Sequence, residues 1–379
     1  MSKRIKIIAD DKIPFLKGVL EPFAEIEYYP GKEITKDKVI NADALIIRTR
    51  TKCNADLLEG TNIKFIATAT IGIDHIDTNY CDKNNIKWTN APGCNSSSVM
   101  QYVTSALLTL AEKENFILAD KTIGIIGVGN VGSKIQKVAD ILGMKVLLND
   151  PPRARVGGDE QFCDLNKIKE EADIITFHVP LITEGEDKTF HLADEKFFNE
   201  LRKEPIIINS SRGEVIKTSA IKSAVKNNKV KNVVIDVWED EPDIDLELLD
   251  LVDFGTPHIA GYSTDGKVNG TTVCVNKINR FFNLGLKENW IPENIPNAEN
   301  GNKIYLDCNS KTEQEILNEA VRQTYSITVD DKILRNSPET FEKQRGDYRI
   351  RREFDNYFIQ PANCNSKVVN KLKKLGFKI

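Results

Sequence analysis

The sequence lacks the features that mark several large classes of protein. Its seven cysteines are scattered and form no C-x-x-C pair, which excludes a cysteine-based zinc framework and is typical of reduced thiols in a cytosol. No stretch approaches the ~18 apolar residues of a membrane span, and the apolar start is too short for a signal peptide. The formal net charge of −4 creates no positive field for nucleic acid. We therefore expect a cytoplasmic protein with no metal, membrane or nucleic-acid partner.

What the sequence does contain is a regular alternation of apolar and polar segments. A chain of 379 residues is too long for one ordinary core, so we expect two or three domains. Short apolar runs predict the buried parallel strands of a first α/β unit at 6–9, 26–29, 44–47 and 65–69. Similar runs predict the strands of a second unit at 122–126, 145–148, 174–177, 206–208 and 233–237. The spacing leaves room for a helix between strands, which is the doubly wound α/β pattern.

The C-terminal part of the chain has a different composition. From 256 to about 285 the chain is expected to return to the first unit, and 290–302 is rich in Pro and Asn, as linkers are. Beyond it, strands at 303–306 and 356–359 and a helix at 313–325 predict a small separate α/β domain.

A glycine-rich segment, Gly127-Val128-Gly129-Asn130-Val131-Gly132, stands between a predicted strand and a predicted helix at 130–142. This context makes it a dinucleotide fingerprint rather than a chance run of glycines. Gly127 permits the tight turn, Gly129 lets a pyrophosphate approach the backbone, and Gly132 lets helix and strand pack closely. The phosphates would lie at the helix N-terminus, where free N–H groups favour negative charge.

Asp150 ends the next strand, eighteen residues after Gly132. A carboxylate at this position accepts hydrogen bonds from the adenosine ribose and repels a 2′-phosphate, so we predict NAD rather than NADP as the cofactor. Arg153 is a weaker signal in the opposite direction, because it is close enough to attract a phosphate.

Three chemically reactive residues follow in a fixed order: Arg212, Glu241 and His258. His258 is the one of four histidines that lies in a loop shaped by Pro257 and Gly261 after a strand end, where ligands of α/β sheets bind. Neutral His258 would take a hydroxyl proton as a hydride leaves, and Glu241 would orient the imidazole. The planar guanidinium of Arg212 would bind a substrate carboxylate. Taken singly, each has an ordinary structural alternative: a surface Arg, an acidic loop and a helix-start His.

With these motifs the chain resembles the D-isomer-specific 2-hydroxyacid dehydrogenases. The resemblance covers the fingerprint, Asp150 and the segments 209–213, 236–242 and 256–261. Further runs match one branch of that family and extend the resemblance over nearly the whole chain: 91–95, 149–154, 191–196, 255–262, 351–353 and 374–377. The fold that it implies is two doubly wound Rossmann-like domains with a cleft between them and a small C-terminal α/β dimerisation domain.

The resemblance assigns roles to individual positions. It implies that Arg212, Glu241 and His258 are catalytic, with His258 as the acid/base. Besides the fingerprint residues, it implies cofactor contacts at Asp150, Val179, Ser210, Ser211, Asp236 and Gly261, with Asp236 on the nicotinamide carboxamide and Val179 through its backbone. It implies substrate contacts at Thr49, Thr70 and Tyr262.

The expected domains and reaction follow from the same resemblance. Residues 1–93 and about 263–286 would bind substrate, 94–262 would bind NAD, and 290–379 would form a homodimer. The branch oxidises 4-phospho-D-erythronate to 2-oxo-3-hydroxy-4-phosphobutanoate in pyridoxine biosynthesis. Two alternatives remain open: an enzyme for another phosphorylated 2-hydroxy acid, such as 3-phosphoglycerate, and an NAD-sensing corepressor.

A terminal phosphate on the substrate needs cations. Two basic clusters offer them: Arg48, Arg50 and Lys52 around Thr49, and Arg345, Arg349, Arg351 and Arg352 in the tail. We expect at least one of these arginines to bind the phosphate, against the alternative that both clusters are solvated basic faces.

Overall fold

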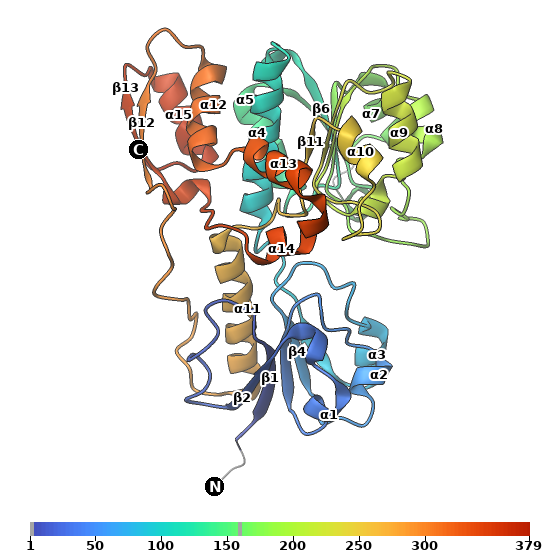
Figure 1. Cartoon of the computed structure of the whole chain (residues 1–379), viewed down its shortest axis with the longest axis vertical. Helices are drawn as coiled ribbons and strands as arrows, with labels where there is room; N and C mark the ends of the chain where they lie inside the picture. Colours follow the sequence, from blue (N-terminus) through green and yellow to red (C-terminus); the bar gives the residue numbers. More distant parts are fainter. Residues whose placement is uncertain (1–3, 158–160) are drawn as a thin grey trace. The chain divides into compact units, whose positions relative to one another are not determined.

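The computed structural model describes residues 4–157 and 161–379. By its internal contacts the chain forms two compact units. The first comprises Met1–Asn95 and Ser263–Pro296, and the second comprises Ser96–Tyr262 and Asn297–Ile379. Each unit is built on its own parallel sheet (Figure 1). The predicted α/β class with a further small C-terminal sheet is confirmed.

The first unit has a five-stranded sheet in the order β2-β1-β3-β4-β5. Its strands are β1 Lys6–Asp10, β2 Glu25–Tyr29, β3 Ala44–Ile47, β4 Phe65–Thr68 and β5 Lys87–Thr89. Its helices are α1 Lys36–Val39, α2 Ala55–Leu58, α3 Thr78–Lys83 and α11 Thr264–Phe282. All residues of β3 and β4 are buried, since α11 packs on one face of the sheet and the shorter helices lie on the other (Figure 1).

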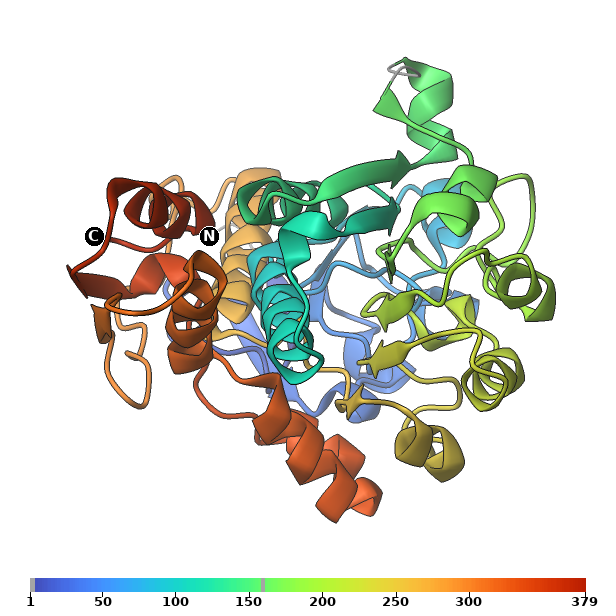
Figure 2. The ribbon, with the colours of Figure 1, turned by 90° about the horizontal axis from the view of Figure 1, so that it is seen from above.

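The second unit has a six-stranded sheet in the order β11-β10-β9-β8-β6-β7. Its strands are β6 Thr122–Ile126, β7 Lys145–Asn149, β8 Ile174–Phe177, β9 Ile206–Asn209, β10 Asn232–Ile235 and β11 Phe254–Gly255. Helices lie on both faces of this sheet, as Figure 2 shows from above. The helices of this unit are α4 Ser96–Lys113, α5 Gly132–Leu142, α6 Pro151–Val156, α7 Leu165–Glu171, α8 Glu195–Asn199, α9 Thr218–Lys226 and α10 Leu246–Leu251. The order reverses at β6, and the carboxyl ends beside such a reversal are where α/β sheets bind ligands.

The C-terminal segment, 297–379, packs on helices and a strand of the second unit. It contains β12 Lys303–Asp307, α12 Glu313–Thr324, α13 Ile327–Asn336, α14 Phe341–Gly346, β13 Phe358–Ala362 and α15 Ser366–Leu375. Helix α12 packs on α4, α15 packs on α5, and α13 packs on β11 (Figure 1). Short 3-10 turns complete the chain: η1 Gly31–Glu33, η2 Leu118–Asp120, η4 Gly213–Val215, η5 Pro338–Thr340 and η6 Phe354–Asn356.

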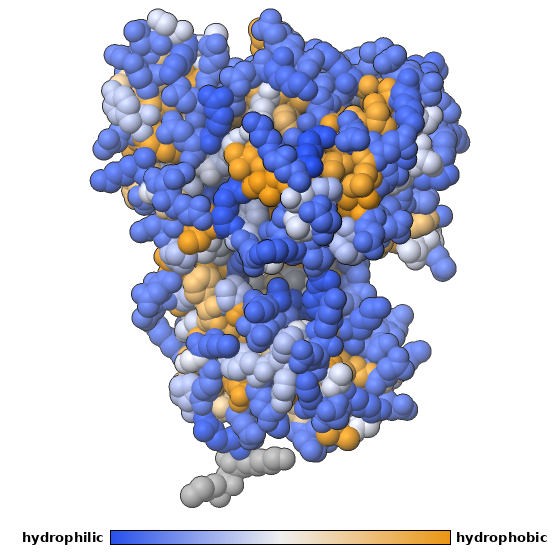
Figure 3. All heavy atoms as spheres, viewed as in Figure 1, coloured by the Kyte–Doolittle hydropathy of each residue, from blue (hydrophilic) through white to orange (hydrophobic). Residues whose placement is uncertain are grey.

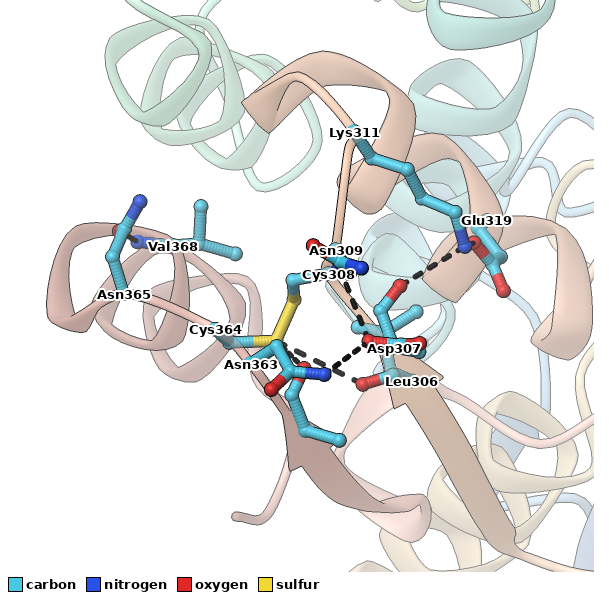
Figure 4. The surroundings of a disulfide bond; sticks show 11 residues. Leu306, Asp307, Cys308, Asn309, Lys311, Glu319, Asn363, Cys364, Asn365 and Val368 are labelled. Atoms are coloured by element: carbon cyan, nitrogen blue, oxygen red, sulfur yellow. Dashed lines mark hydrogen bonds and ion pairs between the residues drawn. A yellow bond between two sulfur atoms is a disulfide. The ribbon is translucent and has the colours of Figure 1, made fainter.

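One prediction about the cysteines is wrong. Cys308 and Cys364, 56 residues apart in sequence, form a disulfide with their Cα atoms 4.9 Å apart (Figure 4). The cause is strand pairing: Asp307 of β12 lies opposite Ala362 of β13. Cys308 directly follows Asp307, and Cys364 lies two residues after Ala362, at the same end of the sheet. The other five cysteines form no disulfide among the described residues, as expected.

Across the described ranges, 4–157 and 161–379, every helix is too short or too polar to cross a bilayer. On the face shown in Figure 3, hydrophilic residues predominate and hydrophobic ones gather in a few separate patches.

Candidate active site

The fingerprint forms a tight turn between β6 and α5. Gly127 has φ +85°, and a Cβ there would lie 2.6 Å from the carbonyl oxygen of His178. A Cβ at Gly132 would lie 2.0 Å from the carbonyl oxygen of Gly127, so any side chain would separate helix from strand. A Cβ at Gly129, by contrast, would meet nothing within 4 Å. Two glycines therefore close the turn, and the third leaves open space beside the backbone, as a pyrophosphate requires.

Asp150 follows β7 and faces the same turn. Its Oδ2 accepts a hydrogen bond of 2.8 Å from the backbone N–H of Val128, and its Oδ1 accepts one of 3.2 Å from that of Arg153, which caps α6. Each carboxylate oxygen has a further lone pair for a ribose hydroxyl. The Arg153 guanidinium donates to the Val128 carbonyl, so its Nη1 is turned back onto the fingerprint.

Of the other predicted cofactor positions, Asn130, Val131 and Val179 lie in or beside this turn, and Ser210 directly follows β9. Asn130 and Val131 lead into α5, and a Cβ on Gly127 would lie 2.8 Å from Cγ1 of Val179. The Oγ of Ser210 is buried without a hydrogen-bond partner within the described part of the chain. A buried hydroxyl without a partner is costly, so this atom is suited to contact a bound group. These residues fit a dinucleotide.

The loop after β9 is folded by the side chain of Asn209. Its Oδ1 accepts hydrogen bonds from the N–H and Oγ of Ser211 at 3.1 and 2.9 Å, and its Nδ2 donates to the Arg212 carbonyl at 2.9 Å. A Cβ at Gly213 would lie 2.0 Å from the carbonyl carbon of Trp238. Only glycine permits this contact, and the close packing brings the Arg212 loop against the loop that follows β10.

The loop after β10 carries Glu241 to His258. Nδ1 of His258 lies 2.8 Å from Oε2 of Glu241, and the backbone N–H of Trp238 donates to Oε1 at 3.0 Å. Burial alone would raise the pKa of Glu241, but the hydrogen bond and charge of His258, with the Trp238 N–H and the charge of Arg345, lower it. An ionised carboxylate only accepts, so the Nδ1 of His258 carries the proton and Nε2 is the basic atom.

His258 itself is held in an uncommon backbone conformation. Its φ is +55°, and its N–H bonds the carbonyl oxygen of Asp236 at 2.7 Å. The Asp236 carboxylate accepts hydrogen bonds from the N–H groups of Ile259 and Ala260 and from the Thr256 hydroxyl. Burial raises the pKa of Asp236. Asp236 therefore organises the His258 loop, while Gly261 and Tyr262 end that loop half-buried.

The other histidines have different partners. Burial lowers the pKa of His178 to about 3 and that of His75 to about 4, and each bonds a threonine hydroxyl. Nε2 of His191 lies 2.6 Å from Oε1 of Glu239, a pairing that the sequence did not indicate. His258, paired with Glu241, lies in the loop that follows the carboxyl end of β11.

The two threonines proposed for substrate contact belong to the first unit. Thr49 is exposed after β3, and the Thr70 hydroxyl lies 2.8 Å from that of Thr68 and donates to the Gly72 carbonyl at 3.1 Å. Nearby Arg48 donates two hydrogen bonds of 3.0 and 3.1 Å to the buried carboxylate of Asp10.

The structure narrows the prediction for the substrate phosphate. Arg351 is 2% exposed and donates to the carbonyls of Ser98, Ile259 and Ala260 and to the Gln101 amide oxygen. A guanidinium with these partners is a structural link, so Arg351 is not a phosphate ligand. Arg349 pairs with buried Asp330, and Arg352 is itself buried.

Three residues shape the site in ways that the sequence interpretation did not predict: Asn209, Trp238 and Arg345. The first two act through backbone contacts that only the folded loops create. Arg345 was grouped with the other tail arginines, and its Nη1 lies 4.0 Å from Oε2 of Glu241. Within the described ranges, no three His, Cys, Asp or Glu side chains converge on a metal position.

Comparison with known proteins gives consistent results. A family model described as D-isomer specific 2-hydroxyacid dehydrogenase, NAD binding domain, matches residues 105–260. A second, described as a domain of unknown function (DUF3410), matches residues 299–376. A solved structure of D-lactate dehydrogenase from Aquifex aeolicus, complexed with NAD and lactic acid, has a TM-score of 0.62 at 25% identity and covers 73% of this chain and 95% of that chain.

Two relatives match over almost the full length. The erythronate-4-phosphate dehydrogenase of Bacteroides thetaiotaomicron is 52% identical over 356 residues, 94% of this chain and 99% of that protein. That of Salmonella arizonae is 39% identical over 376 residues, 98% of each chain.

Fold, fingerprint and family match together define an NAD-dependent 2-hydroxyacid dehydrogenase. The predicted fold class and NAD cofactor are thereby confirmed. The full-length similarity is more specific: the chain belongs to the erythronate-4-phosphate dehydrogenase family.

Proposed function

We propose that this chain oxidises 4-phospho-D-erythronate at C2 to 2-oxo-3-hydroxy-4-phosphobutanoate, with reduction of NAD to NADH and release of a proton, in pyridoxine biosynthesis. The observation that carries the proposal is the contact of 2.8 Å between His258 and Glu241, in a domain whose fingerprint fits a dinucleotide. The choice of substrate is supported by relatives 39% and 52% identical to the chain, which are erythronate-4-phosphate dehydrogenases.

Each residue of the site then has a chemical task. NAD, when bound, supplies the acceptor for the C2 hydride. Nε2 of His258 takes the C2 hydroxyl proton, because Nδ1 is occupied by Glu241. Arg212 binds the substrate carboxylate through its planar guanidinium. Asp236 is proposed to orient the carboxamide of the nicotinamide, and its Oδ2 accepts one hydrogen bond of 2.9 Å in the structure, which leaves a lone pair for that contact.

The domain roles extend the same proposal. We assign substrate binding to 1–93 and about 263–286, with Thr49 and Thr70 as its hydroxyl contacts, and NAD binding to 94–262. Tyr262 is a further proposed substrate contact. The five cysteines that form no disulfide support a cytoplasmic location for the enzyme. The Cys308–Cys364 disulfide argues in the opposite direction, because the cytoplasm tends to reduce such bonds.

A panel of acids tests the substrate assignment. The folded protein is assayed with NAD and with NADP on 4-phospho-D-erythronate, D-erythronate, 3-phospho-D-glycerate and D-lactate, and NADH is followed by absorbance. We expect the highest kcat/KM for 4-phospho-D-erythronate with NAD. A higher kcat/KM for 3-phospho-D-glycerate would identify that acid as the substrate in place of 4-phospho-D-erythronate. If NAD binds but no acid is turned over, the result would favour the corepressor alternative.

We also propose that the C-terminal segment forms a homodimer. Its two-stranded sheet buries Ile304, Leu306 and Ile359 on one face. On the other face Tyr305 and Phe358 are 67% and 45% exposed, and the register places them as diagonal neighbours. Large apolar side chains exposed together on a sheet face are typical of an interface.

A further inference from the structure

We propose that Arg345, which the C-terminal segment contributes, is a positioning residue for the Glu241–His258 pair and holds the carboxylate in its orienting place throughout the reaction. The inference rests on the proposed roles of Glu241 and His258. It gives the C-terminal segment a part in the chemistry besides assembly.

Arg345 meets Glu241 at the oxygen that bonds the histidine. Its Nη1 lies 4.0 Å from Oε2 of Glu241, and the same Oε2 lies 2.8 Å from Nδ1 of His258. Oε1 is bonded by the Trp238 N–H. The carboxylate thus lies between the imidazole of His258 and a permanent cation, Arg345.

The arginine is itself held in place. Its Nη1 lies 3.1 Å from Oε1 of Glu342, one turn earlier in α14, and its guanidinium lies 5.7 Å from the ring centre of Tyr262 and 5.8 Å from that of Phe341. The Arg345 side chain is 16% exposed and that of Glu241 is 19% exposed. Solvent screens such a pair less than it screens a surface ion pair. The charge of Arg345 therefore stabilises the ionised form of Glu241 more than an exposed arginine at the same distance would.

The catalytic cycle supplies the reason for a second cation. In the oxidising direction His258 must be neutral before it takes the substrate proton. At that moment Glu241 is half-buried without a charged histidine beside it, and burial favours its neutral form. A protonated Glu241 would no longer fix the Nδ1–H tautomer of His258. Arg345 keeps a positive charge near Glu241 at this stage, so that the carboxylate stays ionised and Nε2 stays basic.

The charged groups around His258 come from two segments, the loop after β10 and helix α14. Glu241 and Asp236 belong to the loop after β10, and Arg345 and Glu342 belong to α14. Arg345 lies outside the match to the NAD-binding family model, at 105–260, and inside the match to the domain of unknown function, at 299–376. The positioning role therefore belongs to the C-terminal domain of this chain and not to its NAD-binding domain.

The test uses the full-length chain with Arg345→Met, Arg345→Lys and the control Lys343→Met. Lys343 is on the same helix, is 75% exposed and pairs only with Asp347 among the residues described. For Arg345→Met we expect about a tenfold lower kcat, a KM for the phosphorylated acid within about twofold, and unchanged NAD affinity and Tm. The acid limb of the pH–rate profile should move to higher pH, because the charge of Glu241 then acts on His258 alone. Arg345→Lys should restore most of kcat, and Lys343→Met should match wild type.

Two further measurements separate positioning through Glu241 from other roles of Arg345. In a Glu241→Gln background, Arg345→Met should have little additional effect; the same tenfold loss in both backgrounds would overturn positioning through Glu241. A wild-type kcat and pH profile, or a raised KM alone, would also overturn it, the latter because it indicates direct substrate binding. NMR titration of His258, assigned by its absence in His258→Asn, should differ between wild type and Arg345→Met, and Arg345→Gln takes its place if the methionine variant does not fold. This titration needs no turnover, so it distinguishes failure of this inference from failure of the proposed function.

Discussion

At positions 127, 129 and 132 glycine is needed for different reasons. Gly132 has no room for a side chain, since its Cβ would lie 2.0 Å from a backbone oxygen, whereas a Cβ at Gly129 would meet nothing within 4 Å. The sequence motif alone does not separate these roles. The space around each Cβ does, and it separates a folding requirement from a binding requirement.

This difference predicts distinct outcomes for two alanine variants. Gly129→Ala should keep the Tm of wild type but weaken NAD, because its methyl group enters the space that the pyrophosphate would use. Gly132→Ala should lower both Tm and NAD affinity, because helix α5 must move away from β6. Differential scanning calorimetry and NAD titration check both. Equal Tm losses in the two variants would contradict this assignment.

His178 gives a prediction for pH dependence. Burial lowers its pKa from 6.5 to about 3, so below pH 6.5 the unfolded state binds more protons than the folded state and stability falls as pH falls. Between about pH 7.5 and about pH 5.5 this group should remove about 1.4 kcal/mol from the free energy of unfolding. Urea denaturation at the two pH values, with His178→Gln as the comparison, measures it. The contribution would be refuted if wild type and variant lost the same stability on acidification.

At the scale of elements, the C-terminal segment is tied to the His258 loop. Arg351 donates to the carbonyls of Ile259 and Ala260, Tyr348 packs edge-on to Tyr262 with ring centres 6.0 Å apart, and Asp331 accepts from the Gly255 N–H at 2.8 Å. These contacts join β11, the loop and the C-terminal helices in one unit. The loop geometry that brings His258 to Glu241 thus depends on residues ninety positions later in the chain.

Removal of the buried link should therefore affect stability and turnover together. Arg351→Met should lower the free energy of unfolding by about 3 kcal/mol or more, because several buried carbonyls lose their donor. Arg322→Ala, which breaks an exposed pair with Glu112, should change it by less than about 0.5 kcal/mol. Chemical denaturation and kcat report both effects. Wild-type values for Arg351→Met would contradict the link.

The elements themselves could be predicted largely from sequence. Buried parallel strands such as β3, β6 and β8 are continuous apolar runs, and their positions matched within a residue. The sequence missed β5, whose residues Lys87–Thr89 are half exposed, and β11, which is only two residues long. Strand β10 begins one residue before the predicted start and ends at Ile235, since the following residues turn into the site loop. Edge strands lack the apolar pattern on which such prediction depends.

Site residues that belong to a local sequence motif could be predicted, whereas contacts between residues far apart in the sequence could not. Glycine spacing pointed to the fingerprint, and residue order pointed to Glu241 and His258. The contact of Arg345 with Glu241 spans more than a hundred residues and has no local pattern. The Cys308–Cys364 bond was missed for the same reason, because only the pairing of β12 with β13 brings the two thiols together.

At the scale of the whole molecule, the proposed homodimer predicts a change of mass. Tyr305→Glu combined with Phe358→Glu should shift the protein from dimer to monomer, because two charges cannot be buried unpaired in an apolar interface. Val156→Glu is the matched control, since Val156 is 90% exposed in another part of the chain. Light scattering after size exclusion measures the mass. A monomeric wild type, or a dimer in the double variant, would refute this interface.

We propose that His258, oriented by Glu241, transfers the proton and that the separate fingerprint binds NAD. The most direct measurement compares turnover of 4-phospho-D-erythronate with NAD affinity in one preparation of His258→Ala. We predict that kcat falls about 10²-fold to 10⁴-fold, while the dissociation constant for NAD stays close to that of wild type. Turnover near the wild-type rate in this variant would contradict the claim.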